Sequence, residues 1–127
     1  MTLQPYLKST SIFRCPGDSN PGPSDWSPRK NGFMSFYLNS NLAGQKKSVL
    51  LFSRSTILLG DGSNGKDISD ATYSKSSLPP EWIADPNSPA WRHLNGANYL
   101  MADGSVHWLR PNEVTTFGGR KNAFAIR

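Results

Sequence analysis

The chain alternates short apolar runs with long polar stretches, and helical periodicity is nearly absent from it. Residues 33–38 and 56–59 are aromatic or branched runs bounded by Gly, Asn and Asp, which is typical of strands that end in turns. The second run is apolar throughout, which predicts a strand that is central in its sheet or buried on both faces. Helical spacing is confined to residues 1–9, which have the pattern of the last turns of a helix that begins upstream.

Residues 97–110 carry the clearest local signal, that of a β-hairpin. Two strand-like runs, 97–102 and 105–110, flank the dipeptide Asp103-Gly104. A two-residue type I′ turn needs positive φ at both central residues, and Asp-Gly adopts that conformation at low cost. The sequence therefore predicts a hairpin with a two-residue turn at this dipeptide.

The register of this hairpin decides which side chains reach the core. With a two-residue turn, Met101 faces Val106 across the strands. Tyr99 then faces Trp108 on the same side, and this wholly apolar face is predicted to belong to the core. His107 falls on the opposite, mixed face, where a lone histidine is more often a partly buried, hydrogen-bonded side chain than a ligand.

Two long irregular segments, 14–32 and 60–91, make up much of the remaining chain. The first holds four Pro and three Gly, which interrupt any helix or strand, and the second is polar with a short helix expected near 80–84. The predicted fold is therefore α+β: a mostly antiparallel β-sheet with long loops and little helix, in a single domain over residues 1–127.

Three tryptophans in these loops, Trp26, Trp82 and Trp91, allow two interpretations. Large aromatic side chains in loops commonly fasten those loops to the sheet beneath them. Alternatively, the three side chains line a site for a carbohydrate or another ligand, and the chain is an extracellular binding module.

Composition narrows the classes of function. A length of 127 residues suits one domain, and the single cysteine, Cys15, excludes an internal disulfide. The net charge of +5 comes from scattered basic residues whose longest runs are pairs, so a nucleic acid is not expected as a partner. The longest apolar run, 48–52, is far shorter than the roughly 20 residues that cross a bilayer, and the first residues contain no export signal.

Short motifs follow one another in a distinctive order. His93 is followed, after nine residues, by Asp103-Gly104, and this spacing resembles the C-terminal motif of the planctomycete-type pseudopilin-like (prepilin-type) proteins. Five further segments agree with that family in the same order, so the resemblance covers nearly the whole chain: residues 3–7 (LQPYL), 13–16 (FRCP), 35–41 (SFYLNSN), 57–61 (ILLGD) and 92–93 (RH).

The resemblance implies a pseudopilin-like head domain without catalytic activity, an exported structural subunit of a type II secretion or type IV pilus-like assembly. Family members begin with a leader, a cleavage site and a hydrophobic helix, to which no segment here corresponds, so residues 1–127 are expected to be the C-terminal head alone. Expected partners are other pilin-like subunits or components of a secretion machine. The full-length form is expected in the periplasm or at the cell surface, with membrane contact only through the N-terminal helix.

His93 and Asp103 also suggest a catalytic pair, in which a carboxylate orients a histidine base. Ten residues of strand would separate them by about 30 Å unless the chain bends at Gly96, so no dyad and no catalytic residue is predicted. Asp103 is expected to start the turn, and His93 to pin the entry to the hairpin through a side-chain hydrogen bond to the backbone. Contact of His93 with a neighbouring subunit is the other interpretation.

Candidate metal ligands are few. Asp61, Asp67 and Asp70 lie on a Gly-rich segment and offer the oxygen ligands that calcium prefers, although an ordinary polar loop has the same composition. Two histidines and one cysteine would need carboxylates to complete a zinc site, and zinc is not expected. Cys15 is predicted to be a buried small side chain rather than a reactive thiol activated by Arg14.

Overall fold

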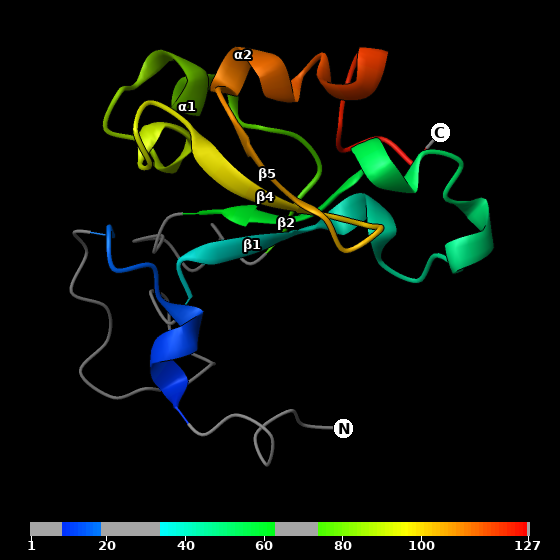
Figure 1. Ribbon diagram of the computed structural model, residues 1–127, viewed down its shortest axis with the longest axis horizontal. Helices are drawn as coiled ribbons and strands as arrows, with labels where there is room; N and C mark the ends of the chain where they lie inside the picture. The colour runs from blue at the N-terminus through cyan, green and yellow to red at the C-terminus, as the bar shows by residue number, and fades with distance from the viewer. Residues whose placement is uncertain (1–8, 19–33, 63–73, 127) are drawn as a thin grey trace.

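The structure is a computed structural model that describes residues 9–18, 34–62 and 74–126 (Figure 1). In these ranges the protein is a small α+β fold, with one five-stranded sheet, two short α-helices and several 3-10 turns. None of the helices in these ranges has the length and apolar character that crossing a bilayer requires.

The sheet has the strand order β3-β1-β2-β4-β5. Neighbours in the series β1, β2, β4 and β5 are antiparallel, and the two-residue strand β3 pairs parallel to β1 at the edge. The prediction of a mostly antiparallel sheet is therefore confirmed. The strands are β1 (Phe36–Asn39), β2 (Ile57–Asp61), β3 (Ser74–Lys75), β4 (Ala97–Met101) and β5 (Val106–Leu109).

Strand β2 is central in the sheet, as its unbroken apolar character predicts. It extends further than expected, through Gly60 to Asp61. An irregularity in its pairing with β4 between Ile57 and Leu59 leaves Leu58 as an extra residue, as in a β-bulge. Leu58 and Leu59 are only half-buried, so the strand is not fully covered on both faces.

Both α-helices lie on the same face of the sheet (Figure 1). Helix α1 (Pro80–Ala84) confirms the short helix expected near 80–84, and helix α2 (Pro111–Val114) follows β5. Each begins with a proline, whose fixed φ suits the first helical position and whose missing N–H costs no hydrogen bond there. The 3-10 turns are η2 (Thr10–Phe13), η3 (Ser40–Leu42), η4 (Lys47–Val49), η5 (Ser53–Ser55), η6 (Pro89–Trp91) and η7 (Phe117–Gly119).

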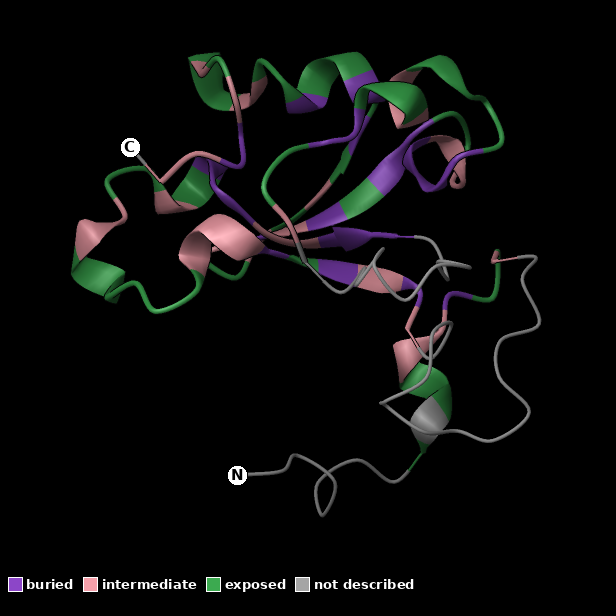
Figure 2. Cartoon of the chain, turned by 180° about the vertical axis from the view of Figure 1, so that it is seen from behind, coloured by how far each residue is buried: buried purple, intermediate pink, exposed green. Residues whose placement is uncertain are grey.

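The core lies between the helices and the sheet face that they cover (Figure 2). Tyr37 is at its centre, with its ring stacked on Phe124 and edge-on to Trp82, at centroid distances of 5.8 Å in both pairs. The buried members are Tyr37, Ile57, Leu78, Ala90, Ala97, Tyr99, Met101, Leu109, Val114, Ala123 and Phe124.

The C-terminal residues are held against the start of β2 by buried polar bonds. The Asn39 amide donates to the carbonyls of Ile57 and Phe124, at 2.8 Å each. The Ile57 N–H donates to the Ala123 carbonyl at 2.8 Å. Asn39, a residue expected only to mark the end of a strand, therefore joins two distant parts of the chain.

The β4–β5 hairpin differs from its prediction by one residue in register. Tyr99 lies opposite His107, and Asn98 lies opposite Trp108, so three residues rather than two form the loop. Of the Asp103-Gly104 pair, Gly104 alone has a positive φ, +92°. This pattern is that of a three-residue loop with glycine in the left-handed position.

The side chain of Asp103 explains the longer loop. Its Oδ1 accepts hydrogen bonds from the N–H of Ser105 at 3.0 Å and from the Ser105 hydroxyl at 2.6 Å. An aspartate that binds the backbone two residues ahead stabilises the turn locally without needing a left-handed conformation itself. The sequence signal identified the turn correctly but not its length.

The change of register moves alternate side chains of β5 to the other face. Val106 is 65% exposed and Trp108 is 42% exposed, so the prediction that they lie in the core is wrong. Tyr99 and Met101 are fully buried, as predicted. His107 lies opposite the buried Tyr99, so its predicted place on the mixed face is wrong. It is half-buried, with its Nε2 3.2 Å from the Ser105 hydroxyl, as expected of a partly buried, hydrogen-bonded histidine.

The hydroxyl groups of Tyr37 and Tyr99 are buried beside Asp61. The two hydroxyls interact with each other, although neither forms a hydrogen bond of regular geometry with a described group. Burial raises the pKa of both hydroxyls, because ionisation would place a charge in the apolar core, and the charge of Asp61 raises both further.

We expect Tyr99→Phe to leave the free energy of unfolding at pH 7 within about 1 kcal/mol of the wild-type value, because a buried hydroxyl without a hydrogen bond of regular geometry contributes little. Above pH 10 the unfolded chain loses tyrosine protons that the folded chain retains, so stability falls as pH rises, by up to about 1.4 kcal/mol per pH unit for each tyrosine. Tyr99→Phe should make this alkaline decline shallower. Urea unfolding from pH 7 to 11 measures both effects, and a large loss at pH 7 would show that the hydroxyl has a partner.

Candidate functional site

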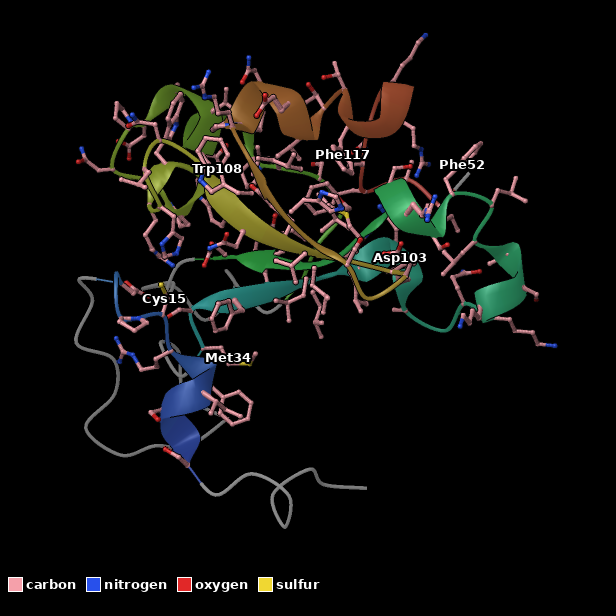
Figure 3. All side chains as sticks on the ribbon, in the orientation of Figure 1. Cys15, Met34, Phe52, Asp103, Trp108 and Phe117 are labelled. Atoms are coloured by element: carbon pink, nitrogen blue, oxygen red, sulfur yellow. The ribbon has the colours of Figure 1, made fainter. Side chains whose placement is uncertain are left out.

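A buried polar cluster lies where three distant segments meet at one end of the sheet. Cys15 and Asp18 come from the segment after η2, Asp61 ends β2, and Arg92 and His93 follow η6. These five residues are called the polar cluster below. Figure 3 shows Cys15 at this end of the sheet and Asp103 at the opposite end.

Arg92 lies between two carboxylates. Its Nη2 is 3.7 Å from Asp18 Oδ2, and its Nη1 is 3.9 Å from Asp61 Oδ1. The exposed fractions of these side chains are 9% for Arg92, 6% for Asp18 and 2% for Asp61. One guanidinium and two carboxylates leave this buried group with a net charge of −1 when all three are ionised.

Further hydrogen bonds orient these ions. Arg92 Nη2 donates to the Gly62 carbonyl at 2.8 Å, and the Ser35 hydroxyl donates to Asp18 Oδ2 at 2.8 Å. The backbone N–H of Asn98 donates to Asp61 Oδ2 at 2.9 Å. Buried charges persist only when they are paired and hydrogen-bonded in this way, so the cluster holds its three segments in one arrangement.

The imidazole of His93 faces two different partners with one nitrogen. Nε2 is 3.3 Å from Cys15 Sγ and 3.4 Å from Asp61 Oδ2. In a nucleophilic triad the base contacts the nucleophile through one ring nitrogen and the carboxylate through the other. Because Cys15 and Asp61 share one nitrogen, this arrangement is not a triad.

The backbone around His93 is held by a tight turn. The His93 N–H donates to the Gly96 carbonyl at 2.8 Å, and the two residues between, Leu94 and Asn95, have φ values of +54° and +67°. Two left-handed central residues are the mark of a type I′ turn, which was expected nine residues later, at Asp103-Gly104. The His93 carbonyl accepts a 2.6 Å hydrogen bond from Trp108 Nε1.

His93 thus pins the entry to the hairpin, but through its main chain. Its side chain was expected to bond the backbone, whereas it reaches Cys15 and Asp61 instead. Asp103 belongs to a different set of contacts, those of the hairpin turn with Gly104. Hydrogen bonds from Ser105 lower the pKa of the Asp103 carboxyl.

The other predicted site residues divide between described and undescribed parts of the chain. Asp61 is buried in β2 and bonded to the polar cluster, not carried on a loop. Asp67 and Asp70, like Trp26, lie outside the described residues, so the calcium set stays a prediction.

Trp82 and Trp91 are half-buried and pack against the core. Trp91 Nε1 donates to the Trp82 carbonyl at 3.0 Å, which ties the two loop segments together and agrees with a fastening role. A surface hollow of about 460 Å³ lies beside Trp91, so the ligand-site interpretation stays open as a prediction. The hollow is lined by Ile83, Trp91, Asn95, Arg110 and Asn112.

Sequence reasoning treated the members of the polar cluster one by one and missed their convergence. Cys15 and His93 are 78 positions apart, and no local pattern connects them. One signal was present: three of the motif segments, 13–16, 57–61 and 92–93, each contain a member of the cluster.

Comparisons with protein-family models, curated proteins and solved structures found no match to this chain.

We expect Arg92→Gln to lower the free energy of unfolding by about 3–5 kcal/mol, because it removes a buried cation that lies within 4 Å of two buried carboxylates. Arg54→Gln is the matched control: Arg54 is 93% exposed and 3.9 Å from Asp103, so its loss should cost no more than about 1 kcal/mol. Urea unfolding followed by tryptophan fluorescence compares the two. Equal effects would show that the Arg92 cluster does not stabilise the fold.

Proposed function

We propose that this chain is the head domain of a non-catalytic, pilin-like assembly subunit, exported and placed in a type II secretion or type IV pilus-like structure. One observation carries the proposal: among the described residues, a row of partly exposed apolar side chains crosses the sheet face opposite the helices. The helices and the core occupy the other face (Figures 1 and 2).

The sheet face opposite the helices carries one apolar side chain on each of four adjacent strands. Leu38 pairs with Leu59, Leu59 with Leu100, and Leu100 with Val106, and residues directly opposite one another share a face. These four residues are called the outer apolar row. Leu38 is 45% exposed and Val106 is 65% exposed, while the two leucines between them are half-buried.

A shallow hollow extends the outer apolar row. Its volume is about 290 Å³, and it is lined by Leu38, Asn39, Ser40, Leu42, Ala43 and Leu58. The extra residue in β2 thus adds Leu58 to this surface next to Leu38. Contiguous exposed apolar surface of this kind marks a contact with another protein segment more often than a free surface.

The resemblance to pseudopilin-like proteins supplies the kind of partner. A pilin-type subunit carries a hydrophobic helix, and an amphipathic helix packs readily on an apolar sheet face, as α1 and α2 do on the opposite face. The partner proposed for the outer apolar row is therefore a helix of the pilin type.

The polar cluster also supports the proposal. Three motif segments that carry the resemblance meet there, and their polar residues contact one another. A motif that holds a head domain together agrees with a structural subunit.

We expect a photo-cross-linking amino acid at position 38, introduced in the source cells, to capture a subunit with an N-terminal apolar helix. Val106→Glu should abolish this product, because it places a charge in the outer apolar row, whereas Leu51→Glu should not. Leu51 is 69% exposed, which makes it a matched control. Mass spectrometry identifies the partner.

Both substitutions are on exposed side chains, so both variants should unfold at the wild-type urea concentration. Equal cross-linking in the two variants would contradict the proposed surface. Quenching of tryptophan fluorescence by oligosaccharides, with no subunit captured, would favour the ligand-binding alternative.

A further inference from the structure

Three potential metal ligands of different chemistry converge in the polar cluster. Cys15, Asp61 and His93 each offer one ligand atom, and these atoms all lie within 4.8 Å of one another. We propose that Cys15 Sγ, Asp61 Oδ2 and His93 Nε2 bind a divalent transition metal of the zinc class.

Two of the three distances between these ligand atoms suit a tetrahedral site. Zinc–ligand bonds of roughly 2.0–2.3 Å at tetrahedral angles place neighbouring ligand atoms about 3.4–3.6 Å apart. His93 Nε2 is 3.3 Å from Cys15 Sγ and 3.4 Å from Asp61 Oδ2. Small side-chain adjustments around one ion would satisfy all three bonds.

Hydrogen bonding alone does not satisfy this arrangement well. His93 Nε2 carries either one proton or one lone pair, yet it faces both a thiol and a carboxylate oxygen. If Nε2 carries a lone pair, it faces the Asp61 oxygen as one acceptor facing another. If Nε2 carries a proton, the Cys15 sulfur and the Asp61 oxygen compete for that proton. A cation between the three atoms accepts a lone pair from each.

The charge of the surroundings favours a cation. Asp61 is 2% exposed, so its carboxylate is a buried anion, and its Oδ2 lies 3.4 Å from His93 Nε2. A divalent cation bound by the Cys15 thiolate and the Asp61 carboxylate places two positive charges against two negative ones. Arg92 Nη1 lies 3.9 Å from Oδ1, the other oxygen of Asp61.

The donor set selects the class of metal. A thiolate with an imidazole and a carboxylate suits zinc better than calcium, which prefers oxygen ligands alone. The backbone N–H of Asn98, bonded to Asp61 Oδ2, fixes the orientation of that carboxylate as outer partners do in zinc sites. Of the three proposed ligands, His93 is the one with a partly exposed side chain, at 32%.

Cobalt(II), a spectroscopic substitute for zinc, tests the proposal on the full chain after chelator treatment. We expect one Co²⁺ per chain, with a thiolate-to-cobalt charge-transfer band and the intense visible bands of tetrahedral cobalt. Zn²⁺ should displace it stoichiometrically. Absence of both the charge-transfer band and stoichiometric binding in the wild-type chain would overturn the proposal.

Variants locate the site. Cys15→Ser should lose the charge-transfer band and weaken Zn²⁺ binding at least about tenfold to a hundredfold, and Asp61→Asn should weaken it by a similar factor. His107→Gln and Asp103→Asn are the matched controls, since they alter the other His and a carboxylate at the far end of the sheet. Unchanged binding in Cys15→Ser, or loss in the controls, would place the metal elsewhere.

Folding of each variant is checked by circular dichroism without metal. If Cys15→Ser fails to fold, the charge-transfer band of the wild-type chain still shows whether Cys15 binds the metal, because Cys15 is the single thiol in the sequence. In the wild-type chain, Zn²⁺ should also raise the midpoint of thermal unfolding, since it binds the folded state alone.

Discussion

The structure depends on the burial of charge at one end of its sheet. Arg92 is enclosed with Asp18 and Asp61, and each of these ions loses the water that would stabilise it outside the protein. Such a group is tolerated only when all its members are in place together. The segment around residues 15–18, the end of β2 and the turn before β4 must therefore come together as one unit, although the hydrophobic core lies on the helix side of the sheet.

Local elements of the fold could be predicted from the sequence where short-range chemistry decides them. The proline at the start of α1 and the apolar run that becomes β2 are examples, because their signals lie within a few residues. The hairpin shows the limit of this reasoning. Asp103-Gly104 suits two turns of different length, and the bonds from Ser105 to the Asp103 side chain select the longer one. That one-residue difference exposes Trp108 and Val106.

The polar cluster could not be predicted, for a different reason. Cys15, Asp61 and His93 each have an ordinary local explanation, as a buried thiol, a loop carboxylate and a turn residue. Their chemistry arises from proximity across 78 positions, which depends on the packing of β2 beside β4. The single hint was that the motif segments 13–16, 57–61 and 92–93 each contain a member of the polar cluster. Trp82 and Trp91 are the opposite case. Their fastening role could be predicted because the two residues are only nine positions apart in the chain.

The attachment of residues 13–18 to the sheet has a mechanical consequence. Among the described residues, this segment is joined to the rest by the bond from Ser35 N–H to the Phe13 carbonyl and by side-chain contacts of Cys15 and Asp18. A tensile load applied at the start of the chain would reach the sheet through these few contacts, acting together in shear. In a protein that is pulled from that end, the bond between Ser35 and Phe13 would take up force together with the contacts that Arg92 and His93 make to this segment.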